Sequence, residues 1–450
     1  MNNDNTPAGR GPSTVRLRIL GILVLMSFVA YLLRTNLSFA APEMMADLHL
    51  SEIQWGYVMA AFTAGYTIFQ FPGGLLGDRL GPRRVLTAVM ILWAVLTAVT
   101  SLVPEGSSGS AIAIVGSLML VRFLVGVTHA PAFPVVNSSV VRWFPPGRWA
   151  LPQGLSSTGL TLGGAAGAIA VPLMIGQFGW RTAFVVLAPL GLLVAWLWWW
   201  YSRDDPARHP GVNEAEIEFI DGGRSRSGMS PAQAGPPAAD EQGMWLRVLR
   251  NRDVLLLTLS YSSMNFVFYI VFNWFYYYLV EVRDFSATDA GFVTSAQWIA
   301  GAAGATLGGW LCDRMCSRLG LRWGCRWPVI IGMGLSVVLL LVGAFHPSAV
   351  VAVTAMVLLF FFNQINEGPY WAASIAVGGR HAGAAGGVMN TGANAMGIVN
   401  SLLVPWLAYA FGWTAAIASA AVFALLGIAF MLGVRADRPI QAQEASHGAA

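Results

Sequence analysis

GGLLGDRLGPRR, at residues 73–84, indicates the architecture of the chain, because its opening returns as GGWLCDR at residues 308–314. The offset is 235 residues (308 minus 73), about half of the 450-residue chain. At an offset of 233, six further residues recur in the same order: Gly154, Thr158, Gly159, Pro172, Gly179 and Trp180 return as Gly387, Thr391, Gly392, Pro405, Gly412 and Trp413. This internal repeat predicts two halves of like structure.

Twelve long apolar stretches place the chain in a membrane. Hydrophobic residues make up 56% of it and charged residues 11%, and a spanning helix needs about 20 mostly apolar residues. Lipid offers no hydrogen-bond partners, so the spans are expected to be helical. The expected helices are residues 17–41, 53–76, 85–104, 110–139, 150–173, 181–201, 254–280, 288–311, 327–346, 348–371, 382–406 and 412–434. With the repeat, they predict an all-α membrane protein of two six-helix bundles.

The arginines predict the topology. All 26 basic residues are arginines. When the chain is placed in a bacterial inner membrane with both termini and the central loop on the cytoplasmic side, 22 of the arginines lie on cytoplasmic segments. The formal charge of +4 therefore reports topology, and no nucleic-acid partner is expected. The expected parts are a cytoplasmic tail (1–16), a six-helix bundle (17–201), a Pro- and Gly-rich cytoplasmic linker (202–253), a second six-helix bundle (254–434) and a cytoplasmic tail (435–450).

Several chemistries are excluded by what the sequence lacks. Without lysine, the chain has no Walker-type phosphate-binding lysine and no Schiff base. No nucleophile–base pair is evident, so we expect neither an enzyme nor a cofactor. Cys312, Cys316 and Cys325 are expected to be reduced and incidental, because a metal site would need tighter spacing and a fourth ligand. We expect no metal and a monomer.

Two arginines lie inside the apolar stretches, where charge is costly. Arg122 falls near the middle of its helix, and an arginine there costs about 2.5–3.5 kcal/mol on insertion scales. Arg34 lies in the first helix. Two guanidinium groups facing one cavity suit an anionic solute, because each can hold a carboxylate or sulfonate by two parallel hydrogen bonds. Two alternatives stay open: Arg34 could extend to the outer surface, and Arg122 could form a buried ion pair.

Two titratable residues, His129 and Glu367, also lie inside predicted spans. His129 follows Arg122 by seven residues and so shares its helix face, while Pro131 and Pro134 should kink that helix. Glu367 is the acidic residue well inside a span. Polar stripes at helical spacing occur at Tyr66 and Gln70; Asn265, Tyr269, Asn273 and Tyr277; Asn363, Asn366 and Glu367; and Asn390 and Asn394. Such stripes serve either a solute or helix packing.

The loop after the second helix resembles the signature of the major facilitator superfamily, G-x-x-x-D-R-x-G-x-R-R. The matching residues are Gly74, Asp78, Arg79, Gly81, Arg83 and Arg84, and Asp313 and Arg314 repeat the central pair. The resemblance covers all twelve spans and implies alternating access between two bundles. In it, Asp78 would pair with arginines across the seam between the bundles and favour one conformation.

Within that superfamily the chain resembles the anion:cation symporters that take up sugar acids such as galactonate, hexuronates and glucarate. The resemblance rests on RTNLSFAAP (34–42), VRFLVGVTHAPAFPVVNSSVVRWFPPG (121–147), RDDPARHPGVNEAEIEFI (203–220) and GGVMNTGANAMGIV (386–399). It implies that Arg34 and Arg122 bind the substrate carboxylate. It further implies that Tyr66, Trp371, Asn390 and Asn394 line the site.

The usual proton-carrying carboxylates of that branch are replaced by Leu33 and His129. Coupling would therefore fall to His129 or Glu367 as carriers of H⁺, use another ion, or be absent. We expect secondary transport of a small organic anion: a sugar acid, carboxylate or sulfonate. The alternatives are an organophosphate or drug exchanger of the same fold, or a membrane sensor that no longer transports; counterflow separates the sensor from the transporter.

Overall fold

The computed structural model of the protein describes residues 11–104, 111–226, 244–279, 283 and 285–440. The regular elements within those ranges are helices. They are α1 (Val15–Asp47), α2 (Glu52–Leu80), α3 (Pro82–Thr100), α4 (Ala111–His129), α5 (Ala132–Trp143), α6 (Ala150–Tyr201), η1 (Pro206–Arg208), α7 (Glu214–Arg226), α8 (Met244–Arg250), α9 (Arg252–Tyr277), α10 (Ala287–Phe345), α11 (Ala349–Ile365), α12 (Glu367–Gly378), η4 (Gly379–His381), α13 (Ala382–Phe411) and α14 (Trp413–Gly433).

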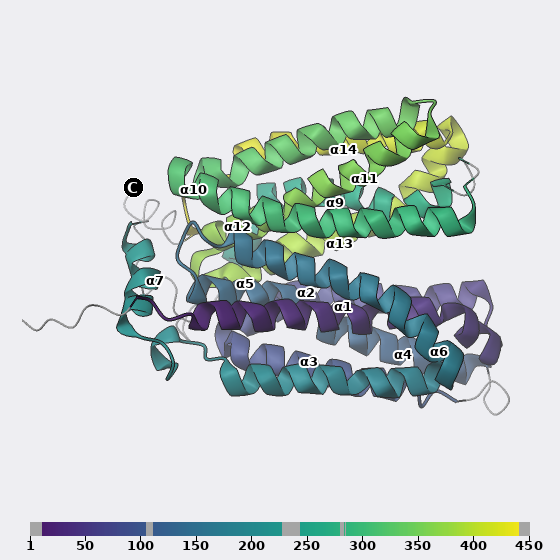
Figure 1. Ribbon diagram of the computed structural model, residues 1–450, viewed down its shortest axis with the longest axis horizontal. Helices are drawn as coiled ribbons and strands as arrows, with labels where there is room; N and C mark the ends of the chain where they lie inside the picture. The colour runs from purple at the N-terminus through teal and green to yellow at the C-terminus, as the bar shows by residue number, and fades with distance from the viewer. Residues whose placement is uncertain (1–10, 105–110, 227–243, 280–282, 284, 441–450) are drawn as a thin grey trace, which may run out of the picture.

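The helices form two bundles that lie side by side. In Figure 1, α1–α6 occupy one half of the molecule and α9–α14 the other, with α7 at one end. Within the described residues, eight helical runs are long and apolar enough to cross a membrane. Some runs hold two spans: α6 turns back at Gly179 and α10 at Gly320, whose φ angles of 75° and 76° suit glycine. The predicted all-α membrane fold of two bundles is confirmed.

Several helices extend beyond their predicted ends. The segment 312–326 was expected to connect two helices, but α10 stays helical on both sides of Gly320. Likewise, α1 continues to Asp47 instead of ending at residue 41. Charged residues end an apolar run, but they are good helix formers in water, so a helix need not stop where its lipid-facing part stops.

Two helices break where proline removes a backbone donor. The helix expected at 110–139 ends as α4 at His129 and resumes as α5 at Ala132, so the break predicted around Pro131 is confirmed. A second break separates α11 from α12, with Pro369 in the first turn of α12. Each break therefore puts a titratable residue, His129 or Glu367, at a helix terminus.

The first part of the central linker is ordered against α1. Arg16 forms an ion pair of 2.9 Å with Glu216 of α7, and the Asn213 side chain accepts a 2.9 Å hydrogen bond from the Ser13 N–H. The predicted low-complexity stretch, residues 227–243, lies outside the described residues. The division of the chain into a linker and two bundles at those boundaries stays a prediction.

Candidate functional site

A cavity of about 80 Å³ lies between the two bundles. It is lined by residues of both: Tyr31, Arg34, Tyr66, Phe133, Ser157 and Leu160 from one, and Tyr261, Asn265, Phe268, Tyr269, Gln364, Glu367, Trp371, Asn390 and Asn394 from the other. Eight residues singled out from the sequence therefore share one cavity: Arg34, Tyr66, Asn265, Tyr269, Glu367, Trp371, Asn390 and Asn394. Arg122 and His129 are not in its lining.

Arg34 supplies the positive charge of the cavity wall. Its guanidinium carbon lies 5.1, 5.0 and 4.8 Å from the ring centroids of Tyr31, Phe62 and Tyr66, respectively. One guanidinium N–H donates to the Tyr31 hydroxyl at 3.4 Å. Aromatic faces attract a cation without neutralising it. Because no acidic residue pairs with Arg34 in the described part of the chain, its charge is available to an anion in the cavity.

Arg122 lies behind the cavity wall. Its guanidinium carbon is 4.8 Å from the Phe62 ring centroid, and the guanidinium carbon of Arg34 is 5.0 Å from the same centroid. The two guanidinium carbons are therefore at most 9.8 Å apart. Arg122 is only 4% exposed, and its Nε has no hydrogen-bond partner. Neither the surface position left open for Arg34 nor an ion pair for Arg122 is found among the described residues.

His129 is enclosed by aromatic rings. Its imidazole stacks on Trp93 with a centroid distance of 3.9 Å and meets the edges of Phe62 and Tyr66 at 6.0 and 5.5 Å. The side chain is 1% exposed, and Nε2 has no hydrogen-bond partner. As predicted, it shares a helix face with Arg122, since both contact Phe62. That face, however, packs against rings and does not open into the cavity.

Glu367 opens into the cavity from the opposite bundle. The Tyr261 hydroxyl donates to its carboxylate at 3.0 Å and the Trp371 indole N–H at 3.1 Å. Glu367 is in the first turn of α12, where the helix dipole favours a negative charge. The helix break redirects the predicted stripe: Asn363 donates to the Met264 carbonyl at 3.3 Å and Asn366 is fully buried, so neither lines the cavity.

The amides of α13 complete the wall. Asn394 donates to the Asn390 carbonyl at 2.7 Å and accepts a 3.1 Å hydrogen bond from the Tyr269 hydroxyl. Tyr269 and Asn265 belong to the predicted stripe on α9; the side chains of Asn273 and Tyr277 lie outside the described residues.

Seven lining residues were not identified from the sequence: Tyr31, Phe133, Ser157, Leu160, Tyr261, Phe268 and Gln364. The spacing of two of them carried a signal, because Tyr31 precedes Arg34 by three residues and Tyr261 precedes Asn265 by four, which places each beside an identified residue on one helix face.

The repeated aspartates join the bundles at the end that carries α7. The Asp78 carboxylate accepts hydrogen bonds from the N–H groups of Gly383 and Ala384, at 3.0 and 2.9 Å, at the start of α13. The Ser138 hydroxyl donates to Asp78 as well, at 2.6 Å. Asp78 thus binds the free N–H groups of a helix start in the other bundle, where the sequence had suggested arginines.

Asp313 makes the matching contact in the second half. Its carboxylate accepts hydrogen bonds from Ala150 at 2.8 Å and Leu151 at 3.0 Å, at the start of α6. Ala150 and Leu151 precede Gly383 and Ala384 by 233 positions (383 minus 150), which is the offset of the sequence repeat. The repeat therefore encodes one contact between the bundles, built twice in opposite directions across the seam.

Other residues of the repeated motif shape the helix ends. Gly74 packs so closely on the Gly383 carbonyl that a Cβ would not fit, and Gly81 turns the chain with a φ of 88°. Arg83 donates to the Trp199 carbonyl at 2.8 Å and so ties α3 to the end of α6. Arg79, Arg84 and Arg314 are exposed at this end.

Two repeated helical bundles with a polar cavity between them form the architecture of secondary transporters. Residues 23–320 match the Major Facilitator Superfamily, and the chain belongs to that family. It is not an enzyme, because this family and the similar curated proteins are transporters.

The similar proteins extend over most of the chain. A probable sulfoacetate transporter of Cupriavidus necator is 32% identical over 393 residues, covering 87% of each chain. A probable galactarate/D-glucarate transporter of Bacillus subtilis is 30% identical over 411 residues, covering 90% of this chain and 88% of that one. Among solved structures, the Escherichia coli fucose:proton symporter superposes with a TM-score of 0.72 at 15% identity, covering 93% of this chain and 99% of that one. The last likeness concerns the fold alone.

Proposed function

We propose that this protein imports a small organic anion, namely a sugar acid, carboxylate or sulfonate, across the bacterial inner membrane in symport with H⁺. The observation that carries the proposal is the charge of Arg34, which faces the cavity without an acidic partner among the described residues. The chain's similarity to transporters named for sulfoacetate and for galactarate and D-glucarate supports the same class of cargo.

In the proposed site, Arg34 binds the anionic group directly and Arg122 acts from behind Phe62. A guanidinium can hold a carboxylate by two hydrogen bonds. A second charge at most about 10 Å from Arg34 adds an attraction of about 2 kcal/mol at an effective dielectric constant near 20. Tyr66, Trp371, Asn390 and Asn394 supply the hydrogen-bonding groups that a hydroxylated or carbonyl-bearing anion needs.

Glu367 is the proposed proton carrier. It lines the same cavity as Arg34 and, among the described residues, forms no ion pair that would hold it ionised, so a proton that enters with the substrate can bind to it. His129 was the other candidate, but its ring is packed among aromatic side chains and is 1% exposed. We therefore assign His129 to packing.

The proposed cycle uses the paired aspartates as its inner gate. Both termini and α7 are placed in the cytoplasm, as the arginine distribution predicts, so the Asp78 and Asp313 contacts close the cytoplasmic end. Substrate binding would lower the free energy of an intermediate closed at both ends, after which these contacts open. The protein is proposed to work as a monomer.

The test is uptake by the full-length protein reconstituted into liposomes, with sulfoacetate, galactonate and glucarate as labelled anions and fucose as a neutral sugar. We expect uptake of at least one anion and none of fucose. Arg34→Ala should reduce uptake to the level of protein-free liposomes. Arg34→Lys, which keeps the charge but loses the paired hydrogen bonds, should retain a part of it.

Arg122→Ala should weaken the apparent affinity by roughly 10–30-fold, because it removes a charge that contributes about 2 kcal/mol from a distance. Size-exclusion profiles of all variants control for folding. Uptake of organic phosphates alone would favour the exchanger of the same fold. Anion binding without counterflow would favour the sensor. Wild-type uptake by Arg34→Ala would contradict the proposed site.

A further inference from the structure

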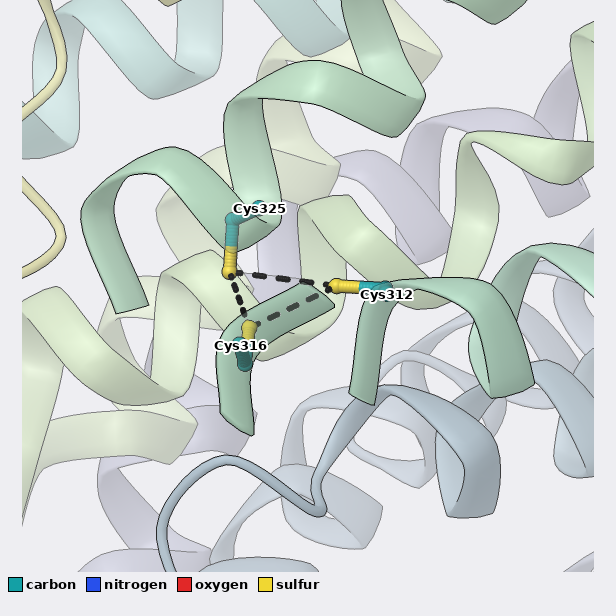
Figure 2. Close-up of side chains that lie close together, drawn as sticks. All are labelled: Cys312, Cys316 and Cys325. Carbon is teal, nitrogen blue, oxygen red and sulfur yellow. Dashed lines mark hydrogen bonds between the residues drawn. The ribbon is translucent and has the colours of Figure 1, made fainter. Parts of the chain in front are cut away.

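Three cysteines, far from the cavity lining, converge at the break in α10. Their sulfur atoms form a nearly equilateral triangle, with separations of 3.9 Å for Cys312 and Cys316, 4.0 Å for Cys312 and Cys325, and 3.8 Å for Cys316 and Cys325 (Figure 2). All three are free thiols. Cys312 and Cys325 are fully buried, and Cys316 is 7% exposed, so a small ion could reach the cluster on the side of Cys316.

The local fold explains why residues distant in sequence meet here. Cys312 and Cys316 are four residues apart and so lie on one face of the helix. The chain reverses at Gly320, and Cys325 returns from the second part of α10. Gly324 makes the approach feasible, because a Cβ at that position would overlap the backbone and the sulfur of Cys316. The sequence alone suggested incidental cysteines, since linear spacing does not reveal this reversal.

The triangle has the dimensions of a metal site. A point just off the plane of three sulfurs at these separations, on the side open to a fourth ligand, lies about 2.3 Å from each, which is the Zn–S bond length. Thiolate clusters select soft ions such as Zn²⁺ and Cu⁺. Among the described residues, no His, Asp or Glu joins the three cysteines as a fourth ligand, so water would fill the fourth position of a tetrahedral Zn²⁺.

We propose that Cys312, Cys316 and Cys325 bind one Zn²⁺ as thiolates, fixing the reversal of α10 and the Asp313 carboxylate beside it. Binding releases three protons and leaves the site with one net negative charge, whereas Cu⁺ would leave two. Burial penalises charge, so Zn²⁺ is favoured. The sequence around the reversal of α10 also carries arginines, which supply positive charge near the three thiolates. They are Arg314, Arg318, Arg322 and Arg326.

The experiment measures metal binding by the reduced, full-length protein in detergent, after removal of bound metal by a chelator. Zn²⁺ is titrated against a chromophoric chelator, with Cu⁺ and Cd²⁺ in parallel; Cd²⁺ reports thiolate ligands by its ultraviolet charge-transfer band. We expect one Zn²⁺ per chain and a Cd²⁺ band that scales with three thiolates. Zn²⁺ should also raise the thermal unfolding midpoint.

Loss of a residue that only supports a metal ligand lowers metal affinity by about 10–100-fold. Cys316→Ser removes a ligand itself, the least buried of the three, so Zn²⁺ affinity should fall by more than that. The variant with all three cysteines changed to serine should bind no Zn²⁺. Ser317→Ala is the matched control: Ser317 is exposed and its hydroxyl donates to the Arg314 carbonyl, so Zn²⁺ binding should stay at the wild-type level.

Monodisperse elution of each variant shows that it has folded. Unchanged Zn²⁺ affinity in the triple variant, uptake of Cu⁺ alone, or no metal uptake by the reduced wild type would each overturn the proposal.

Discussion

The two halves of the molecule break the same helix and use the break differently. In each half the fourth spanning helix is interrupted near proline, and a titratable residue stands at the interruption: His129 at the end of α4, and Glu367 at the start of α12. His129 is enclosed by Trp93, Phe62 and Tyr66. Glu367 opens into the cavity and holds two hydrogen-bond donors.

The same halves agree closely at the end that carries α7. There, Asp78 and Asp313 bind helix starts through equivalent pairs of N–H groups. In the proposed cycle these contacts close the cytoplasmic end of the protein. Both bundles must then meet along one seam, so symmetry is useful at that end. A solute with one charged end has no such symmetry, and the cavity accordingly carries its cation on α1 and its carboxylate on α12.

The largest effect is expected from Glu367→Gln. The amide can still accept hydrogen bonds from Tyr261 and Trp371, but it cannot bind and release a proton as a carboxylate does. Uphill uptake driven by a proton gradient should therefore fall to that of protein-free liposomes. Counterflow, which needs no net proton movement, should persist. The measurement compares both activities across pH in the same preparation. A pH profile like that of the wild type would remove Glu367 from the coupling step.

The next effect tests the symmetric end. Asp78→Asn should speed hydrogen exchange at Gly383 and Ala384, and Asp313→Asn should do so at Ala150 and Leu151. Loss of a helix-start contact costs about 0.5–2 kcal/mol, or roughly tenfold in exchange rate. Asp78→Asn should have the larger effect, because Ser138 also donates to Asp78.

Asp289→Asn is the control for this pair of variants. Asp289 belongs to a helix start of its own, where its N–H and carboxylate contact Ser286. Its replacement should leave exchange at both seams unchanged. Equal exchange in all three variants and the wild type would show that the aspartates do not hold the bundles together.

A smaller effect is expected for the neutral wall of the cavity. Asn394→Ala removes the acceptor of the Tyr269 hydroxyl. A hydrogen bond is worth about 1 kcal/mol, so the apparent affinity for the anion should weaken by about fivefold. Ser401→Ala, on the exposed side of the same helix, should leave it unchanged. Concentration-dependent uptake measures both, and equal affinities would place Asn394 outside the substrate contacts.

The smallest effect on transport is expected for His129→Gln. The pH profile and rate of uptake should stay within about twofold of the wild type, because the ring packs and does not titrate in the cycle. Stability should fall by about 0.5–1.5 kcal/mol through lost aromatic stacking, measured by thermal unfolding. An altered pH profile with normal folding would transfer the coupling role from Glu367 to His129.

The sequence predicted the fold well because its signals are long or repeated. Each of these signals reflects a physical constraint on the backbone. They are the apolar stretches of bilayer length, the paired GGLLGDR and GGWLCDR segments, and the prolines at 131 and 134. Helix ends were less predictable. An apolar run ends where lipid ends, whereas α10 stays helical into its arginine-rich turn around Gly320.

The candidate site was predictable only in part. Helical spacing put Arg122 and His129 on one face, and both contact Phe62. Spacing could not show that Arg122 would pack on the Phe62 ring outside the cavity lining, since this depends on how α2 packs on α4. The stripe ending at Glu367 failed for another reason: the break at Asn366 changes the phase of the helix, so the two asparagines point elsewhere.

The seam contacts have a consequence for how this sequence can change. Asp78 and Asp313 bind backbone N–H groups, which every residue except proline possesses. The hydrogen bonds that hold the seam therefore do not depend on the side-chain chemistry at Ala150, Leu151 and Ala384. Ala150 and Ala384 are fully buried, so what limits substitution should differ across the seam: side-chain size at the helix starts that donate, and the negative charge at the two carboxylates that accept.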